Sequence, residues 1–403
     1  KADAFIQRNG SRHPKHMRAS RPQGEPVRHV NLNDFGQQAH YLAQAAADCT
    51  ESTAVLYRNN DSALPLIDLL ERRGIPYACR QRESFFFTSP AVRDLTDVLC
   101  FALDGTDRER FLRIYYKLEV RVKRSILQEK LRRVPEGAPV LDALIDGGGV
   151  EPWQTGRLKA LRTHLSKLPQ LSSFAALQRI VKYMGYGDYL SGQGGDKSRV
   201  ELLLALARQE PGVEGFLRRL EALRDTVETG GGDPACPFVL STIHASKGLE
   251  YDTVYLLDVL DGILPAVTEP KDAGQQDQYQ EERRLFYVAV TRARNRLYLF
   301  SCRNRESAFA DELRRGLPRE YIGPEDVFAS LNTEPCGKHY RHAEKGGGVI
   351  RACCRGQCMV AYASGETEFL TLGQMVDRRA VAWRAPDRPA PAALPREQAA
   401  LPP

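Results

Sequence analysis

Two arginines stand where predicted elements end and could bind phosphate groups. Arg292 lies at the end of an amphipathic helix predicted over residues 281–293. Arg58 follows Tyr57 at the carboxyl end of a predicted strand, residues 54–57, and open α/β sheets bind their ligands at such strand ends. A planar guanidinium can pair with two phosphate oxygens at once. An isolated Thr-Arg-Ala would more often place its arginine on an ordinary surface, so the prediction depends on the longer sequence around Arg292.

A second chemistry-bearing segment, residues 241–250, reads Ser-Thr-Ile-His-Ala-Ser-Lys-Gly-Leu-Glu and follows another predicted strand. Lys247 brings a positive charge and Gly248 a flexible backbone. His244 taken alone would more often be a loop histidine whose bonds are satisfied within the protein. The ten-residue context instead favours a contact with a ligand.

Together, these segments resemble two motifs of a known enzyme family. Residues 241–250 and 281–294, the latter reading Glu-Glu-Arg-Arg-Leu-Phe-Tyr-Val-Ala-Val-Thr-Arg-Ala-Arg, resemble nucleotide- and DNA-contacting motifs of superfamily 1 DNA helicases of the UvrD/PcrA/Rep type. The resemblance covers about residues 1–305 and 335–380. It implies the second RecA-like domain of a 3′-to-5′ helicase that uses ATP to move along single-stranded DNA and unwind duplexes in repair or recombination.

The resemblance also implies roles for four residues that would contact ATP. Tyr57 would stack on the adenine ring, and Arg58 and Arg292 would reach the γ-phosphate as catalytic groups. Glu250 would accept a hydrogen bond from a ribose hydroxyl, for which a carboxylate offers open lone pairs.

Five further residues are candidates for contacts with DNA. By resemblance, Thr242 and His244 would touch the DNA backbone, and Lys247 would lie close to a phosphate. Phe86 and Phe87 belong to an aromatic segment that could stack on bases. A hydrophobic plug against neighbouring helices is an equal alternative for this segment, because the family often has Gly-Gly where Arg-Glu precedes it here.

Two elements of a complete helicase are not found in the sequence. There is no Gly-x-x-x-x-Gly-Lys-Ser/Thr phosphate loop and no acidic strand end that would bind Mg²⁺. We therefore expect the chain alone not to hydrolyse ATP, and we expect an N-terminal helicase half to supply the Mg²⁺ ligands. A helicase subunit of a helicase–nuclease is one alternative. A non-catalytic adaptor that binds DNA or RNA polymerase is the other.

The pattern of apolar residues predicts an α/β fold with a RecA-like parallel sheet and a helical insertion. Strand and helix signals alternate in residues 1–107 and again in 233–305, while residues 108–232 show helical spacing almost throughout. Residues 1–30 are basic and show little apolar periodicity, so we expect them to be only a lead-in to the fold.

The C-terminal region allows two interpretations. Short strands between glycines in residues 335–380 resemble the SH3/Tudor-like β-barrel that ends UvrD and PcrA and contacts RNA polymerase in that family. Cys336, Cys353, Cys354 and Cys358 could instead bind zinc, although their spacing fits no standard finger. Residues 385–403 are rich in proline and alanine, which predicts a disordered tail.

Composition sets further limits. The formal charge of +6 is mild, and the basic runs 1–28 and 108–133 could equally be solvated helix faces. No apolar stretch approaches the roughly 18 residues of a membrane span, and no signal peptide opens the chain. Nine cysteines in mostly apolar surroundings suggest a cytoplasmic protein with buried free thiols.

Overall fold

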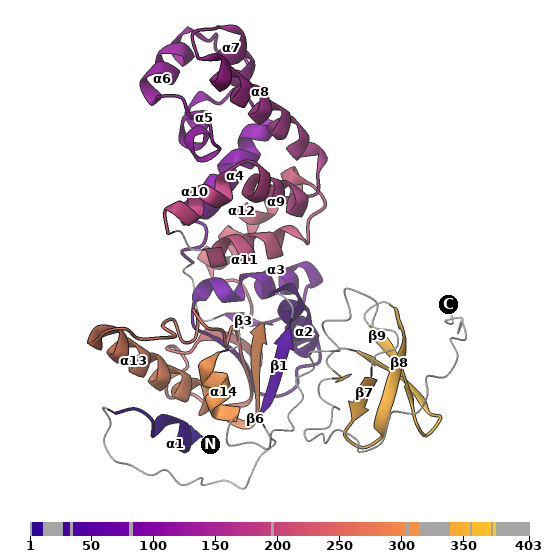
Figure 1. Cartoon of the computed structure of the whole chain (residues 1–403). Coiled ribbons are helices and arrows are strands. Elements are labelled where there is room, and N and C mark those ends of the chain that lie inside the picture. Colours follow the sequence, from indigo (N-terminus) through magenta and orange to yellow (C-terminus); the bar gives the residue numbers. More distant parts are fainter. Residues whose placement is uncertain are drawn as a thin grey trace.

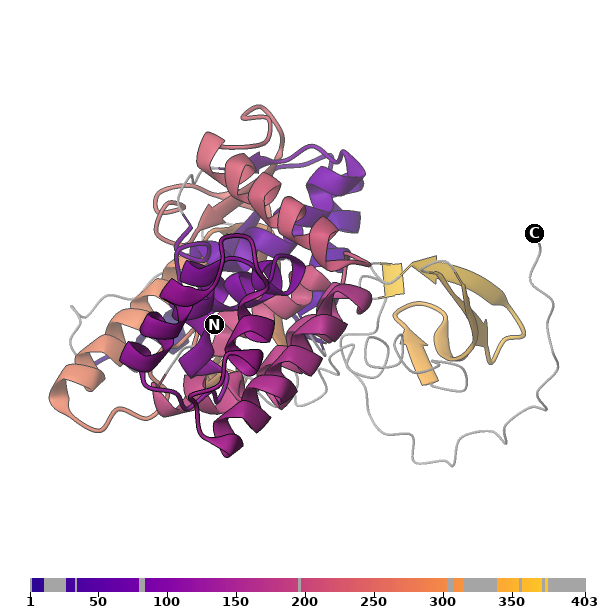
Figure 2. The ribbon, with the colours of Figure 1, turned by 90° about the horizontal axis from the view of Figure 1, so that it is seen from above.

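The computed structural model describes residues 2–10, 27–32, 35–79, 84–194, 197–302, 307–314, 339–354, 357–371 and 374–375 of the chain. The fold is α/β, with a six-stranded parallel sheet, a tall stack of helices above it and a separate four-stranded antiparallel sheet (Figure 1). Seen from above, the helical stack covers much of the parallel sheet (Figure 2).

The six-stranded sheet has its most buried strand near the middle. Its strand order is β1-β6-β5-β2-β4-β3, and every pairing is parallel. The strands are β1 (Arg28–Leu32), β2 (Thr53–Tyr57), β3 (Ala78–Cys79), β4 (Phe238–Thr242), β5 (Tyr251–Leu256) and β6 (Ala293–Cys302). All five residues of β2 are buried, as expected for a strand that is covered by helices on both faces.

Helices cover the two faces of this sheet with separate cores. One core includes side chains of α2 (Phe35–Ala47), α3 (Leu64–Arg73) and α4 (Pro90–Leu103). The other includes side chains of α1 (Ala2–Ile6), α13 (Ala273–Val290) and α14 (Ala308–Arg314). Local sequence explains the ends of these helices. Ser89 accepts a hydrogen bond from the Val92 amide at the start of α4, and Gly74 ends α3 in the left-handed conformation.

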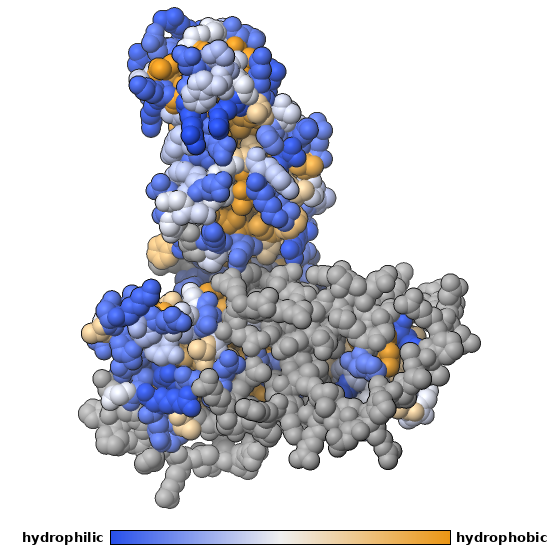
Figure 3. Space-filling model, in the orientation of Figure 1, coloured by the Kyte–Doolittle hydropathy of each residue, from blue (hydrophilic) through white to orange (hydrophobic). Residues whose placement is uncertain are grey.

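The elements described between α4 and β4 are all helical. They are α5 (Arg108–Ile114), α6 (Arg124–Arg133), α7 (Val140–Asp146), α8 (Pro152–Lys167), α9 (Ser173–Tyr183), α10 (Tyr186–Gly192), α11 (Lys197–Ala207) and α12 (Val213–Thr229), with short 3₁₀ turns. We call α5–α12 the insertion helices. Their visible surface is mostly hydrophilic (Figure 3). Within the basic run of this segment, Arg110 and Arg113 pair with Asp97, and Arg133 pairs with Glu129.

The insertion helices share one hydrophobic core with the helices on the adjacent face of the sheet. A buried carboxylate ties the two parts together. The Asp68 side chain on α3 is 2 % exposed and accepts hydrogen bonds from Arg72, at 2.9 Å, and from Arg219 on α12. An ionised carboxylate is costly to bury alone. The two arginines compensate the cost of desolvating the Asp68 carboxylate.

Replacing Asp68 with asparagine should lower the free energy of unfolding by about 2 kcal/mol, because Arg219 loses its anionic partner and Arg72 keeps only Glu210. The expected loss of stability is smaller than for a fully buried ion pair, because the Arg72 and Arg219 side chains are 25 % and 24 % exposed. Chemical denaturation measures the change. Asp142→Asn is the matched control, because Asp142 pairs with Arg162 at the surface with both side chains 47 % exposed. Equal effects of the two substitutions would contradict the argument.

The C-terminal sheet has its own small core. Its strands are β7 (His339–His342), β8 (Gly346–Cys354), β9 (Gln357–Tyr362) and β10 (Thr367–Thr371), in the order β10-β9-β8-β7 and antiparallel throughout. Tyr340, Ile350, Val360, Tyr362 and Leu370 fill the core. The predicted small β-structure is therefore present as a four-stranded antiparallel sheet, and among the described residues no pairing closes it into a Tudor-like barrel.

One cysteine prediction needs correction. Cys358 is disulfide-bonded and lies opposite Cys353 in the strand register, whereas free thiols were expected throughout. Cys49, Cys79, Cys100 and Cys236 form no disulfide, as expected, but these thiols are half-buried instead of buried. Cys336 and the tail 385–403 lie outside the described residues. Within the described part of the chain, no three His, Cys, Asp or Glu side chains form a group that could hold a metal ion.

Candidate nucleotide and DNA contact sites

The loop of residues 243–250 crosses the parallel sheet along the strand direction. It runs from the carboxyl ends of the strands, here called the carboxyl edge, to their amino ends, here called the amino edge. It begins after Thr242, which lies opposite Tyr57 at the carboxyl edge. It ends at Tyr251, which lies opposite Ala293 at the amino edge. Since β4 and β5 both run parallel to β2, the loop must return across a distance of about 16 Å, the length of a five-residue strand. The predicted site residues therefore divide between two edges.

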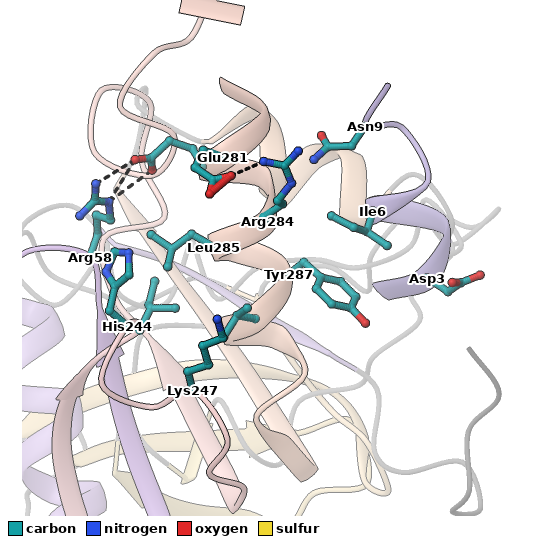
Figure 4. A pocket seen from close by; sticks show the side chains of 13 residues that line it. Asp3, Ile6, Asn9, Arg58, His244, Lys247, Glu281, Arg284, Leu285 and Tyr287 are labelled. Atoms are coloured by element: carbon teal, nitrogen blue, oxygen red, sulfur yellow. Dashed lines mark hydrogen bonds and ion pairs between the residues drawn. The ribbon is translucent and has the colours of Figure 1, made fainter. Parts of the chain in front are cut away.

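At the carboxyl edge, Arg58, His244 and Lys247 surround a cavity of about 500 Å³ beside helix α13 (Figure 4). Its wall combines polar and apolar side chains from α1, β2, the 243–250 loop and α13. The remaining lining residues are Asp3, Ile6, Asn9, Ile243, Glu281, Glu282, Arg284, Leu285, Tyr287 and Val288. The side chains of His244 and Lys247 are exposed, so they can reach a ligand directly.

Glu282 fixes the direction of Arg58. The Glu282 residue is 4 % exposed, and its Oε1 accepts hydrogen bonds from Nε and Nη2 of Arg58 at 3.1 and 3.0 Å. Figure 4 shows Arg58 on the same side of the cavity as His244. The Nη1 donors are not part of this contact, and the Arg58 side chain is 30 % exposed. Charge-assisted pairing of this kind holds a guanidinium in one orientation. The sequence pointed to Arg58 but not to Glu282, whose only signal is its place in the Glu-Glu-Arg-Arg run.

Thr242 shapes the loop from inside. Its hydroxyl accepts a hydrogen bond from the Ala245 amide at 3.2 Å, and the residue is 6 % exposed. Ser246 is also buried and donates to the Ile243 carbonyl at 2.7 Å. Gly248 has a positive φ of 86°, which a side chain would disfavour. These contacts present His244 and Lys247 outward, while the Thr242 hydroxyl itself faces the loop.

Arg292 and Glu250 lie together at the opposite, amino edge. The Arg292 guanidinium donates to the carbonyls of Leu249, at 2.7 Å, and Val288, at 3.0 Å. It thereby fastens the end of the loop to the end of α13. Glu250 is exposed and accepts from Arg294 at 3.2 Å. A carboxylate and a guanidinium that are both held by the fold in this way suit the ribose and phosphate oxygens of a nucleotide.

Arg58 and Arg292 have different partners in this structure. Arg58 pairs with Glu282, whereas Arg292 follows the end of α13, and the helix rises about 12 Å from Glu282 to Val290. That both arginines touch one γ-phosphate stays a prediction. The helix begins eight residues earlier than predicted and ends at Val290, so Arg292 lies just beyond the helix end, as the sequence predicted.

Tyr57 cannot stack on a nucleotide base in this structure. It ends the central strand β2, is 1 % exposed and belongs to the core shared with the insertion helices. Burial raises the pKa of its hydroxyl well above the ordinary value, and the nearby Cys79 adds to this effect. The prediction that it stacks on adenine is corrected by its burial.

The aromatic segment after β3 differs from the prediction in which phenylalanine ring is exposed. Phe86 is fully buried, and Phe87 is partly buried with its ring centroid 5.2 Å from that of Phe86. Phe85 is instead 67 % exposed. Phe86 is therefore a core residue and not a DNA contact, in agreement with the hydrophobic alternative, and Phe85 is the ring available to a ligand.

No helix within the described ranges is long and apolar enough to cross a membrane.

Residues 228–304 match the family model of the UvrD-like helicase C-terminal domain. That match includes both the 241–250 segment and Arg292, so it contains the two edges of the sheet described above.

Curated relatives extend the similarity along the chain. A putative ATP-dependent DNA helicase YjcD of Bacillus subtilis is 26 % identical over 78 % of this chain and 43 % of its own length. The ATP-dependent DNA helicase Rep of Escherichia coli is 28 % identical over 67 % of this chain and 42 % of its own length. The ATP-dependent DNA helicase PcrA of Bacillus subtilis is 24 % identical over 82 % of this chain and 48 % of its own length. The chain thus spans less than half the length of these relatives. Over most of its length, the chain is a homologue of ATP-dependent DNA helicases of the UvrD/Rep/PcrA type.

Proposed function

We propose that this chain provides the second RecA-like half of an ATP-dependent 3′-to-5′ DNA helicase. Residues 1–107 and 233–305 would form the RecA-like domain, with 108–232 as its helical insertion and 335–380 as a separate C-terminal module. The observation that supports the proposal is the 243–250 loop, which joins Arg58, His244 and Lys247 at the carboxyl edge to Glu250 and Arg292 at the amino edge of one sheet.

The carboxyl edge is the proposed DNA side. Arg58, His244 and Lys247 line one cavity there. Arg58 and Arg284 of its wall pair with Glu282 and Glu281, and Asp3 is a third acidic residue, while the Lys247 ammonium group is exposed. Arg58 shares this edge with His244 and is separated from Arg292. We therefore propose that Arg58 contacts the DNA backbone instead of the nucleotide. Contacts to phosphates position a strand without reading its sequence, which suits an enzyme that moves along DNA.

The amino edge is the proposed nucleotide side. Arg292 would donate to the γ-phosphate and Glu250 would accept from the ribose, with Mg²⁺ and the phosphate-binding loop on an N-terminal half. Bound ATP supplies the phosphoryl group whose transfer to water drives the motor. The bond from Arg292 to the Leu249 carbonyl links this edge to the loop, so a shift of the guanidinium would move the loop that carries His244.

The charge contacts at the carboxyl edge predict a salt-dependent affinity for single-stranded DNA. Each neutralised phosphate contributes about −0.7 to the slope of log K against log salt concentration. Replacing Arg58 or Lys247 with glutamine should each reduce that slope by about 0.7. Fluorescence anisotropy with an oligo-thymidine, repeated over a range of salt concentrations, measures both values.

Arg133→Gln is the matched control for this experiment. Arg133 is an exposed arginine on α6 that pairs with Glu129, away from the sheet edge, and its loss should leave the slope unchanged. An affinity that does not respond to salt, or an equal change in all three variants, would reject the carboxyl edge as the DNA side.

A further inference from the structure

The connection between helix α13 and strand β6 is very short. Only Thr291 and Arg292 lie between the last residue of α13 and the first residue of β6. The short connection changes the last hydrogen bonds of the helix. The Arg292 amide, which would bond the Val288 carbonyl in a continued helix, bonds the Ala289 carbonyl at 3.1 Å instead. The Val288 carbonyl is thereby open to other donors.

Two side chains take the place of that amide. The Thr291 hydroxyl donates to the Val288 carbonyl at 2.9 Å, and Arg292 Nε donates to the same oxygen at 3.0 Å. Threonine hydroxyls in helices commonly bond the carbonyl three or four residues earlier. The carboxyl end of a helix also attracts a cation, because the peptide dipoles leave partial negative charge there. The guanidinium is therefore held against the end of α13.

The Thr291 hydroxyl also contacts the guanidinium directly. A hydroxyl has one hydrogen and two lone pairs, and the hydrogen of Thr291 is used on the Val288 carbonyl. The lone pairs remain as acceptors, and Arg292 Nη2 donates to this oxygen at 3.1 Å. On the other side of the group, Nη1 donates to the Leu249 carbonyl at 2.7 Å. Each of the three guanidinium nitrogens thus has one partner in the fold, which fixes the plane of the group.

These bonds leave the Arg292 guanidinium able to bind an anion. The group has five N–H donors, and its contacts within the described part of the chain use one donor on each nitrogen. Nη1 and Nη2 therefore each keep one donor. Two donors on neighbouring nitrogens of a planar group match two oxygens of one phosphate. A group that is oriented before its ligand arrives loses little conformational freedom on binding.

We propose that Thr291 is a positioning residue for Arg292, and that its hydroxyl directs the remaining donors of Nη1 and Nη2 toward the γ-phosphate. This inference rests on the proposed nucleotide role of Arg292. The hydroxyl acts through the guanidinium and does not itself touch the nucleotide. Without the hydroxyl, the guanidinium keeps only its bonds to two carbonyls, and its plane is free to tilt. A misplacement of about 1 Å can cost about 100-fold in rate.

The first measurement uses the chain alone and follows the Arg292 Nε–H group by ¹⁵N-edited NMR, with Arg292→Lys to identify its signal. Exchange of this hydrogen with water should be about 5-fold faster in Thr291→Val, as expected for the loss of one hydrogen bond. Valine keeps the shape of threonine but has no hydroxyl. Thr291→Ser keeps the hydroxyl and should restore the slow exchange.

Thr229→Val is the matched control. Thr229 ends helix α12, and its hydroxyl donates to the Asp225 and Thr226 carbonyls at 2.7 and 3.3 Å. The substitution removes the same hydroxyl from a helix end at a place far from Arg292 in the sequence. It should leave both the Arg292 signal and the ATPase rate unchanged.

The second measurement is DNA-stimulated ATPase activity in an assembly that includes a half with a phosphate-binding loop. Thr291→Val should lower kcat by about 10- to 100-fold and leave KM for ATP within a few-fold, because the orientation of the guanidinium matters in the transition state. Thr291→Ser should have a near-normal kcat. When Arg292 is already alanine, Thr291→Val should have no further effect, because the residue through which Thr291 acts is missing.

The outcomes separate this inference from the proposed function. If Arg292→Ala keeps near-normal turnover, the nucleotide role of Arg292 is rejected, and the positioning role of Thr291 fails with it. If Arg292→Ala loses its activity but Thr291→Val behaves like Thr229→Val in either measurement, only the positioning role is rejected. Three other results would also overturn the positioning role: an equal defect in Thr291→Ser, a rise in KM without a fall in kcat, or a further loss when Thr291→Val is added to Arg292→Ala.

Discussion

Arg292→Ala is expected to reduce the DNA-stimulated ATPase rate by about 10³-fold or more, in an assembly that includes a half with a phosphate-binding loop. This is the low end of the effect of a lost arginine finger. The physical reason is that a guanidinium stabilises the charge that develops on the transferring phosphoryl group, in a site where water cannot replace it. Arg292→Lys should not restore the rate, because an ammonium group lacks the planar fork.

A loss of structure must be distinguished from a loss of chemistry. Arg292 also bonds the Leu249 and Val288 carbonyls, so its removal leaves two acceptors to be satisfied by water. Thermal unfolding and affinity for single-stranded DNA without nucleotide should change little if the defect is chemical. Arg133→Ala, at the exposed Arg133–Glu129 pair, is the control for the removal of one arginine. Near-normal turnover of Arg292→Ala would overturn its assignment to the nucleotide.

Arg58→Ala should behave differently from Arg292→Ala in the same assay. Because Arg58 lies at the other edge of the sheet, its loss should raise the DNA concentration needed for stimulation and leave the rate at saturating DNA within a few-fold. A thousand-fold loss at saturating DNA would restore the sequence-based assignment to the γ-phosphate. The ratio between the two variants thus tests the division of the site into two edges.

The sequence predicts the inner strands of the sheet well because they are local apolar runs. Strands β2, β4, β5 and β6 all appear as short buried segments in the sequence. In contrast, β1 and α1 lie in the basic stretch that was expected to be a lead-in. Strand β1 has only Val30 and Leu32 as apolar residues and is stabilised by pairing with β6, some 270 residues later. Such long-range pairing leaves no local periodicity to detect.

The division of the site could not be predicted for a related reason. Local patterns place Arg58 and Arg292 at the ends of elements, but they do not show which edge of the sheet each end occupies. That depends on β4 and β5 both running parallel to β2, which forces the connecting loop across the sheet. The partner of Arg58 is equally non-local, because Glu282 is 224 positions away in the sequence.

The three consecutive phenylalanines show the same limit on a smaller scale. Composition marks Phe85, Phe86 and Phe87 as one aromatic segment, and either stacking on DNA or packing in the core could explain it. The structure separates the rings: Phe85 lines a cavity, and Phe86 fills the core. Only the turn that follows β3, with its Ser84–Asp61 bond, decides which ring points outward.

Phe86→Ala should therefore lower the free energy of unfolding by about 3–5 kcal/mol, the usual cost of removing a buried phenyl ring and leaving a cavity. Phe85→Ala should change it by less than about 0.5 kcal/mol, because the ring is mostly in water. Denaturant titration of both variants measures the difference. If both substitutions destabilise the fold equally, Phe85 is a packing residue like Phe86, and its exposure does not reflect its contribution to stability.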